Sequence, residues 1–221
     1  MIKYIDYTLF TKGFPVMKVI TLTGVGHEAN TYVLISGGAA AVVDPAVSEE
    51  RVLSVLEREN ATLNAILLTH AHAAHTLTLG AIRVRSSAPL MVGADDAELL
   101  ASPHLNLSPY IVGRAETFES AERLLCEGDE VAVGDESLTV LHLPGHTRGS
   151  VAFLWKNALI CGDTVFAEGF GRYDLPGGNP VTLKSSLKRL SELDGEIMLF
   201  PGHGEACRIK NAQALKRMKN Y

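Results

Sequence analysis

Three histidines, His70, His72 and His75, lie close together directly after the apolar run 65–68. Neighbouring imidazoles repel one another when they are protonated, so a cluster of this kind has few structural uses. Neutral imidazole is the commonest metal-binding side chain in proteins. The stretch 69–75 therefore predicts a metal site at the end of a buried strand, and the simpler alternative is a histidine-rich surface loop.

Three further apolar segments end in a side chain that can bind a metal. Segments 140–143 and 197–200 are each followed by a Pro-Gly pair and then by a histidine, His146 or His203, and segment 158–161 is followed by Asp163. Tight Pro-Gly turns aim the side chain that follows them, and α/β folds place their sites at strand ends on one edge of a sheet. The combined set suits one or two Zn²⁺, Fe²⁺ or Mn²⁺ ions: His70, His72, His75, His146, Asp163 and His203.

The elements that must position these side chains alternate between strands and helices. Apolar, β-rich segments predict strands over 17–22, 31–35, 39–44, 65–68, 90–92, 137–143, 150–155, 157–161 and 196–200. Helical spacing predicts helices over 49–59, after Ser48 as a cap, and over 95–101, 180–193 and 208–219. Segment 102–116 has no clear period and contains Pro103, Pro109 and Gly113, so it is expected to be a long surface segment or a broken helix.

The composition limits the kind of protein and its partners. The chain has 221 residues, of which 47% are hydrophobic and 20% charged, which predicts a single globular domain over 1–221. A net charge of -5 gives no basic surface for nucleic acid or for an anionic membrane. No apolar run approaches the roughly 20 residues that span a bilayer. We therefore expect a small-molecule substrate, no nucleic-acid or membrane partner, and an oligomeric state that the sequence leaves open.

The cysteines and the N-terminal segment indicate a compartment. The three cysteines are widely spaced and odd in number, so they form neither a disulfide framework nor a zinc knuckle. Segment 1–18 carries Asp6 and Lys12 among its apolar residues, which is unlike a secretory signal. Reduced thiols without a signal predict a cytoplasmic protein.

Four short motifs in combination identify a family that the chain resembles. The motifs are His-x-His-x-x-His at 70–75, Pro-Gly-His-Thr at 144–147, Gly-Asp-Thr at 162–164 and Pro-Gly-His-Gly at 201–204. Together they resemble the metallo-β-lactamase superfamily over nearly the whole chain. Stretches 162–166 and 171–178 are similar to its hydroxyacylglutathione hydrolase (glyoxalase II)-like branch. The resemblance implies an α/β fold, a four-layer αββα sandwich with the metals at one edge of the two sheets.

The resemblance also implies roles for individual residues. One metal is expected at His70, His72 and His146, and a second at His75 and His203, with Asp163 bridging the two as the catalytic carboxylate. Asp44, at the end of segment 39–44, is expected to orient a ligand histidine, or else to serve only as a turn residue before Pro45. Arg172 and Tyr173 match the part of the pattern that lines the substrate pocket, although Arg172 would serve equally well in a structural ion pair. The remaining histidines are assigned to surface or packing positions: His27, His104 and His142.

One position departs from the family pattern. The motif is normally His-x-His-x-Asp-His, and Ala74 stands where the aspartate is expected. In the family that carboxylate binds the second metal and helps to hold the attacking water, and a methyl group can do neither. We therefore expect one firmly bound Zn²⁺, with Fe²⁺ or Mn²⁺ as alternatives, and a weakened second site.

The function implied by the resemblance is that of a metal-dependent hydrolase. It would cleave a thioester or a related activated acyl compound through a metal-bound hydroxide, with activity reduced by Ala74. Two alternatives stay open: a mononuclear iron persulfide dioxygenase-like enzyme, and a degenerate member that binds metal without catalysis. The chain ends soon after His203, so no C-terminal glutathione-binding domain is expected and a thiol other than glutathione is favoured.

Overall fold

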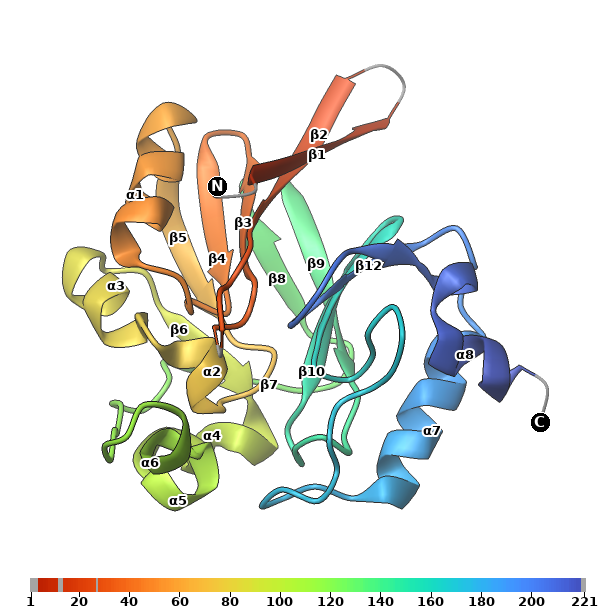
Figure 1. Cartoon of the computed structure of the whole chain (residues 1–221). Coiled ribbons are helices and arrows are strands. Elements are labelled where there is room, and N and C mark those ends of the chain that lie inside the picture. The colour runs from red at the N-terminus through yellow and green to blue at the C-terminus, as the bar shows by residue number, and fades with distance from the viewer. Residues whose placement is uncertain (1–3, 12–13, 27, 220–221) are drawn as a thin grey trace.

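The computed structural model describes residues 4–11, 14–26 and 28–219, which form two β-sheets (Figure 1). Across the first sheet the strands follow the order β1 (Tyr4–Thr11), β2 (Phe14–Leu22), β3 (Thr31–Ser36), β4 (Ala39–Val43), β5 (Thr62–Leu67), β6 (Leu90–Gly93) and β7 (Arg123–Leu125). Across the second sheet the order is β13 (Cys207–Arg208), β12 (Met198–Pro201), β11 (Ala158–Gly162), β10 (Val151–Trp155), β9 (Glu136–His142) and β8 (Glu130–Val133).

Helices cover the outer face of each sheet. Helices α1 (Glu49–Arg58), α3 (Leu79–Arg85) and α4 (Ala97–Ala101) pack on the first sheet, and α7 (Pro180–Ser191) and α8 (Gln213–Met218) pack on the second. Shorter helices lie in the connections: α2 (Ala73–Thr76), η1 (Ala94–Asp96), α5 (Pro103–Asn106), α6 (Ser108–Ile111) and η2 (Ile209–Asn211). None of the helices among the described residues is both long enough and apolar enough to pass through a bilayer.

The alternation of side chains along the central strands builds the layers. In β4, Ala41 and Val43 enter the core between the two sheets, whereas Ala40 and Val42 face the helices outside. Strand β11 divides in the same way, with Ile160 between the sheets and its neighbours in the outer cluster under α7. Because successive side chains of a strand point to opposite faces, an almost wholly apolar strand buries both faces. The expected four-layer αββα sandwich is confirmed.

Most of the expected elements are present, with differences at their ends. The hairpin of β3 and β4, the helix α1 and the hairpin of β10 and β11 lie where the sequence predicts them. Ser48 precedes α1, but its side chain makes no capping hydrogen bond, and its carbonyl oxygen instead accepts from Arg51 N at 3.1 Å. Segment 102–116 is a broken helix, α5 followed by α6. The C-terminal helix begins at Gln213 rather than at 208, because β13 and η2 occupy 207–211.

Four short or peripheral strands were not predicted. They are β1, β7, β8 and β13, which lie at the edges of the sheets. Strand β7 has only three residues and β13 only two. Two or three residues are too few to show the alternation of buried and exposed side chains that marks a strand. In β7 and β13 it is therefore pairing with a neighbouring strand that makes the backbone extended.

The parallel strands bring chemistry-bearing residues to one edge of the sandwich. Strands β4, β5 and β6 are mutually parallel, and β11 is parallel to β12. The carboxyl ends of parallel neighbours lie at the same edge of a sheet. Asp44 follows β4, His70 follows β5, Asp163 follows β11 and His203 follows β12. The candidate site is therefore shared between the two sheets.

Candidate metal centre

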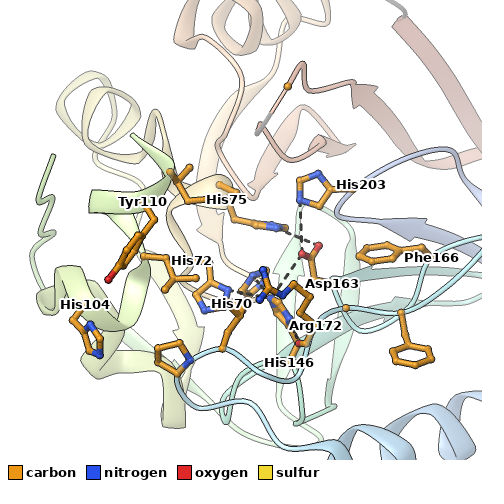
Figure 2. A pocket seen from close by; sticks show the side chains of 18 residues that line it. His70, His72, His75, His104, Tyr110, His146, Asp163, Phe166, Arg172 and His203 are labelled. Carbon is orange, nitrogen blue, oxygen red and sulfur yellow. Dashed lines mark hydrogen bonds and ion pairs between the residues drawn. The ribbon is translucent and has the colours of Figure 1, made fainter. Parts of the chain in front are cut away.

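Six side chains from four connections meet at the common edge of the sheets. Figure 2 shows the rings of His70, His75, His146 and His203 near the carboxylate of Asp163, with His72 beside them, whereas the labelled His104 lies apart. His70, His72, His146 and His75 are at most 4% exposed, whereas His203 is half-buried. The sequence-predicted set is thus brought together: His70, His72, His75, His146, Asp163 and His203.

The first group consists of three imidazoles. The Nε2 atom of His146 lies 3.0 Å from His72 Nδ1 and 3.2 Å from His70 Nε2. The ligand atoms of these three residues lie within 4.8 Å of one another. Three ring nitrogens facing one point form the trigonal base of a tetrahedral metal site, such as the one that Zn²⁺ prefers.

The second group is arranged around Asp163. His75 Nε2 lies 3.3 Å from Asp163 Oδ1, and His203 Nε2 lies 3.7 Å from Asp163 Oδ2. The same Oδ2 atom is 3.7 Å from Nε2 of His146, which belongs to the first group. Asp163 therefore lies between the two groups, as a shared ligand would.

Hydrogen bonds at the outer edges of the rings fix their orientation. His146 Nδ1 lies 2.7 Å from the carbonyl oxygen of Arg172, and His75 Nδ1 lies 2.9 Å from Asp44 Oδ2. A carbonyl oxygen can only accept, so His146 carries its proton on Nδ1 and presents the Nε2 lone pair to the group. Partners of this kind commonly orient histidines that bind metals.

Asp44 lies beneath the second group and is fully buried. It has a φ of 52°, in the left-handed region that aspartate tolerates better than most residues. Its carboxylate accepts hydrogen bonds from Thr69 N at 2.8 Å and from Thr69 Oγ1 at 2.7 Å, in addition to its contact with His75. The Asp44 carboxylate thus fixes both Thr69, at the start of the loop 69–75, and the ring of His75.

Gly202 leaves space that the second group occupies. A Cβ atom at this position would collide with Asp163 Oδ1 and would lie 2.6 Å from His75 Cε1. The Pro-Gly pair before His203 is therefore needed for close approach as well as for a turn.

The surroundings shift the pKa values of the buried groups in opposite directions. Burial, together with the neighbouring imidazoles, lowers the pKa of His70 well below its usual value and that of His72 to about 3. Burial also disfavours the charged form of His75, but the carboxylates of Asp44 and Asp163 outweigh it and raise the pKa of His75 to about 10. Burial works against the Asp163 carboxylate, yet His75 and its neighbours hold the pKa of Asp163 below its usual range.

The donor set fits a divalent cation. His75 Nε2 and Asp163 Oδ1 are buried and face each other at 3.3 Å, and neither makes a well-formed hydrogen bond to the described residues. Buried polar atoms are costly when they are left unpaired, and a cation between them would satisfy both. In the first group, His146 Nε2 carries no proton and faces ring nitrogens of His70 and His72. Nitrogen and carboxylate ligands in this number suit Zn²⁺, Fe²⁺ or Mn²⁺.

A cavity of about 740 Å³ opens over these ligands. Its walls come from the connection that carries α5 and α6 and from the loop after β11. His104, expected at a surface or packing position, is exposed and lines this cavity. His142 lies outside the cavity, where its Nε2 is 2.9 Å from Arg148 O, and His27 is not among the described residues.

Arg172 and Tyr173 occupy different places. The side chain of Arg172 lines the cavity, but its guanidinium pairs with Asp174 through bonds of 2.9 Å and 3.0 Å. Tyr173 is 44% exposed and stacks against Phe170, with ring centroids 6.5 Å apart, and it is not one of the side chains that line the cavity. The contact of Arg172 with the site runs through its backbone carbonyl group, which accepts from His146.

Asp96 is a buried residue of the site that sequence reasoning missed. Its carboxylate accepts hydrogen bonds from Gly149 N at 2.7 Å, Thr147 Oγ1 at 2.8 Å and Ala71 N at 3.3 Å. It therefore joins the loop of His70 and His72 to the loop of His146. The available signal was its place just after β6, at the same edge as Asp44 and Asp163. The two aspartates at 95 and 96 also suit the first turn of the helix expected over 95–101, which hides this role.

Comparison with known proteins identifies the class. The model of the metallo-beta-lactamase superfamily matches residues 24–203. The chain therefore belongs to this superfamily, as the αββα sandwich and the ligand-bearing edge indicate.

Individual relatives agree with that class. A probable metallo-hydrolase of Bacillus subtilis, YqgX, is 36% identical over 190 residues, which cover 84% of this chain and 90% of that protein. The BLEG-1 B3 metallo-beta-lactamase is 32% identical, with a TM-score of 0.80 over 89% of this chain and 95% of its own. TTHA1623, solved in a di-iron-bound form, is 31% identical, with a TM-score of 0.75 over 86% of this chain and 94% of its own.

Proposed function

We propose that the protein is a metal-dependent hydrolase that cleaves thioesters or similarly activated acyl compounds. The observation that carries the proposal is the convergence of His70, His72 and His146 beside Asp163, at the base of a cavity large enough for a small molecule. Similarity to a probable metallo-hydrolase supports the reaction class. Stretches 162–166 and 171–178 support the thioester branch within it.

Each residue of the site has a part in this reaction. His70, His72 and His146 would hold one ion, and His75, His203 and Asp163 would hold a weaker second one. A divalent cation supplies Lewis-acid polarisation of a carbonyl group and lowers the pKa of a bound water to about 7. Asp163 Oδ2, within 3.7 Å of both His146 and His203, is placed to accept a hydrogen bond from the attacking water and to orient it.

The test of the proposal is thioester hydrolysis by the full chain loaded with zinc. Thiol release from S-acetyl-N-acetylcysteamine and from a glutathione thioester would be followed with a thiol reagent, before and after chelation of the metal. We expect hydrolysis that chelation abolishes and zinc restores. A metal-loaded chain that releases no thiol from either substrate would contradict the proposal and favour a non-catalytic metal-binding protein.

Ala74 gives a prediction about metal content. Its side chain lines the cavity beside the second group, at the start of α2. Ala74→Asp would place a carboxylate there, so we expect the zinc content after dialysis to rise from about one to about two ions per chain. Ala74→Asn, of the same size but without charge, is the matched control and is expected to stay near one. Unchanged zinc content in Ala74→Asp would show that position 74 does not contribute to the second metal site.

Metal loading is also expected to depend on pH in different ways at the two groups. The pKa of His75 is raised to about 10, so at pH 7 the metal-free protein holds a proton there that an ion must displace. The affinity of the second ion should therefore rise about tenfold per pH unit between pH 7 and 9. The pKa of His72 is lowered to about 3, so the first ion meets an already neutral ring and its affinity should change little over this range. Calorimetric titration with Zn²⁺ in buffers of different ionisation enthalpy measures both the affinity and the released protons.

A second candidate function is an iron-dependent dioxygenase acting on a persulfide. It is favoured by the proximity of two histidines and one carboxylate, His70, His146 and Asp163, the ligand types that non-haem iron oxygenases use. The solved di-iron form of TTHA1623 shows that a similar chain accepts iron. Oxygen consumption by the iron-loaded chain with a persulfide substrate, without thiol release from thioesters, would select this candidate.

A further inference from the structure

A leucine with an unusual backbone conformation lines the cavity. Leu107, between α5 and α6, has a φ of 65°, in the left-handed region where a bulky side chain is strained. Glycine or asparagine would fit this backbone better. Among the described residues, the other non-glycine positions with positive φ hold Asp44, Asn60 and Lys156. These three side chains are polar or charged, and Leu107 is apolar. The presence of leucine at this strained position therefore indicates that its side chain has a function.

Buried polar groups on both sides fix Leu107 in this conformation. Asn106 and Ser108 are both fully buried. Asn106 Oδ1 accepts from Ser108 N at 2.8 Å, and Asn106 Nδ2 donates to Glu116 O at 2.9 Å. Glu116 N in turn donates to Ser108 Oγ at 2.9 Å. The turn is thus clamped to the returning backbone, which holds the leucine side chain against the cavity.

Leu107 belongs to an apolar wall that reaches the ligand groups. Tyr110 and Ile111 of α6 line the same cavity, and α6 packs beside α2, which carries Ala74 and His75. The methyl group of Ala74 also lines the cavity, so the apolar surface continues from α6 to the ligands. A group bound on this wall would lie beside the ligand groups.

The charges around the cavity favour an uncharged ligand. Apart from the ligand groups, the lining side chain with a permanent charge is Arg172, and its guanidinium already pairs with Asp174. An acyl group bearing a carboxylate would therefore find no unpaired cation among the described lining residues. An apolar acyl group would instead bury its surface against Leu107 and Ile111.

We propose that Leu107, together with Tyr110 and Ile111, forms an acyl subsite, and that the substrate is a thioester with an apolar, uncharged acyl group larger than acetyl. This inference rests on the proposed hydrolase function, since it assigns the substrate class of that same site. The acyl chain lies against α6, and the thiol part of the substrate extends along the opposite wall, the loop after β11.

The test compares acyl groups on one thiol. The zinc-loaded full chain would be assayed with the acetyl and hexanoyl thioesters of N-acetylcysteamine, in the parent and in Leu107→Asn. Asparagine fits the left-handed backbone but is polar, so we expect kcat/KM for the hexanoyl ester to fall about tenfold or more, and kcat/KM for the acetyl ester to change less than about threefold. Leu107→Met, which keeps an apolar side chain, is expected to retain the hexanoyl preference.

A stability measurement separates this role from a purely structural one. Relief of backbone strain should leave the Tm of Leu107→Asn equal to or above that of the parent. Asn60→Gly, which alters a positive-φ residue far along the chain at the end of α1, is the matched control and should leave the acyl preference unchanged. A parent that prefers acetyl, or equal losses on both esters in Leu107→Asn, would overturn the proposal.

A binding measurement keeps the subsite testable if hydrolysis fails. The metal-free chain would be titrated calorimetrically with S-hexyl-N-acetylcysteamine, a thioether that cannot be hydrolysed. If no thioester is cleaved but this probe binds, and binds about tenfold more weakly to Leu107→Asn, the hydrolase function falls and the apolar subsite stands. Absence of binding to the parent chain would overturn the subsite itself.

Discussion

Asp163→Ala is expected to lower kcat/KM for thioester hydrolysis by about 10³-fold or more. Oδ1 of this carboxylate lies 3.3 Å from His75, and Oδ2 lies 3.7 Å from both His146 and His203, so its removal takes a ligand from both groups. It also removes the acceptor that would orient the attacking water. The zinc content of the dialysed protein should fall along with the activity, which can be followed by elemental analysis.

The control for this variant lies in the same loop. Glu168 is exposed and is not one of the residues that line the cavity, so Glu168→Gln removes a charge without touching the ligand groups. It is expected to keep its activity within about twofold and its full zinc content. Asp163→Ala with activity close to that of Glu168→Gln would exclude Asp163 from the reaction.

Gly202→Ala is the second substitution with a large expected effect, although it adds only a methyl group. The new Cβ atom would collide with Asp163 Oδ1 and would come within 2.6 Å of His75 Cε1, so both ligands must move. Displacement of reacting groups by about 1 Å costs about 10²-fold in rate. We expect a loss of that size in kcat, together with weaker binding of the second zinc ion in a calorimetric titration.

Gly169→Ala is the matched control for the glycine substitution. A Cβ atom at Gly169 would meet no other atom within 4 Å. This variant should therefore be as active as the parent, and a thermal melt should show both variants folded. Normal kinetics in Gly202→Ala would show that the close packing of Gly202 against the second group has no part in activity.

The central strands and the principal side chains of the site follow from local patterns in the sequence. The apolar runs before His70 and Asp163 are long enough to be assigned as strands, and parallel pairing then brings their ends together. The Pro-Gly pairs before His146 and His203 mark turns by composition alone. These local signals place the strands and the ligand side chains, whereas the αββα sandwich was expected from the resemblance of the four motifs to the metallo-β-lactamase superfamily.

The features that the sequence did not predict depend on contacts that residue types alone do not indicate. Asp96 acquires its position from Thr147 and Gly149, more than fifty residues away, and nothing adjacent to it in the chain indicates this pairing. The backbone of Leu107 is set by hydrogen bonds to Glu116, so its left-handed conformation has no signature in residue type. For Arg172 the sequence left a substrate contact and a structural ion pair open, and the folded loop turns its guanidinium toward Asp174.

The division of the donor atoms between the two sheets has a consequence for the maturation of the protein. Residues 70–75 precede His146, Asp163 and His203 in the chain and are therefore synthesised before them. Asp96 connects the early loop to the loop of His146, and Asn30 Nδ2 donates to Pro201 O and Gly204 O on either side of His203. These connections can form only after the two sheets have docked. A chain whose sheets have not yet docked would therefore offer an incoming ion an incomplete set of ligands, so full metal binding is expected to follow docking of the two sheets.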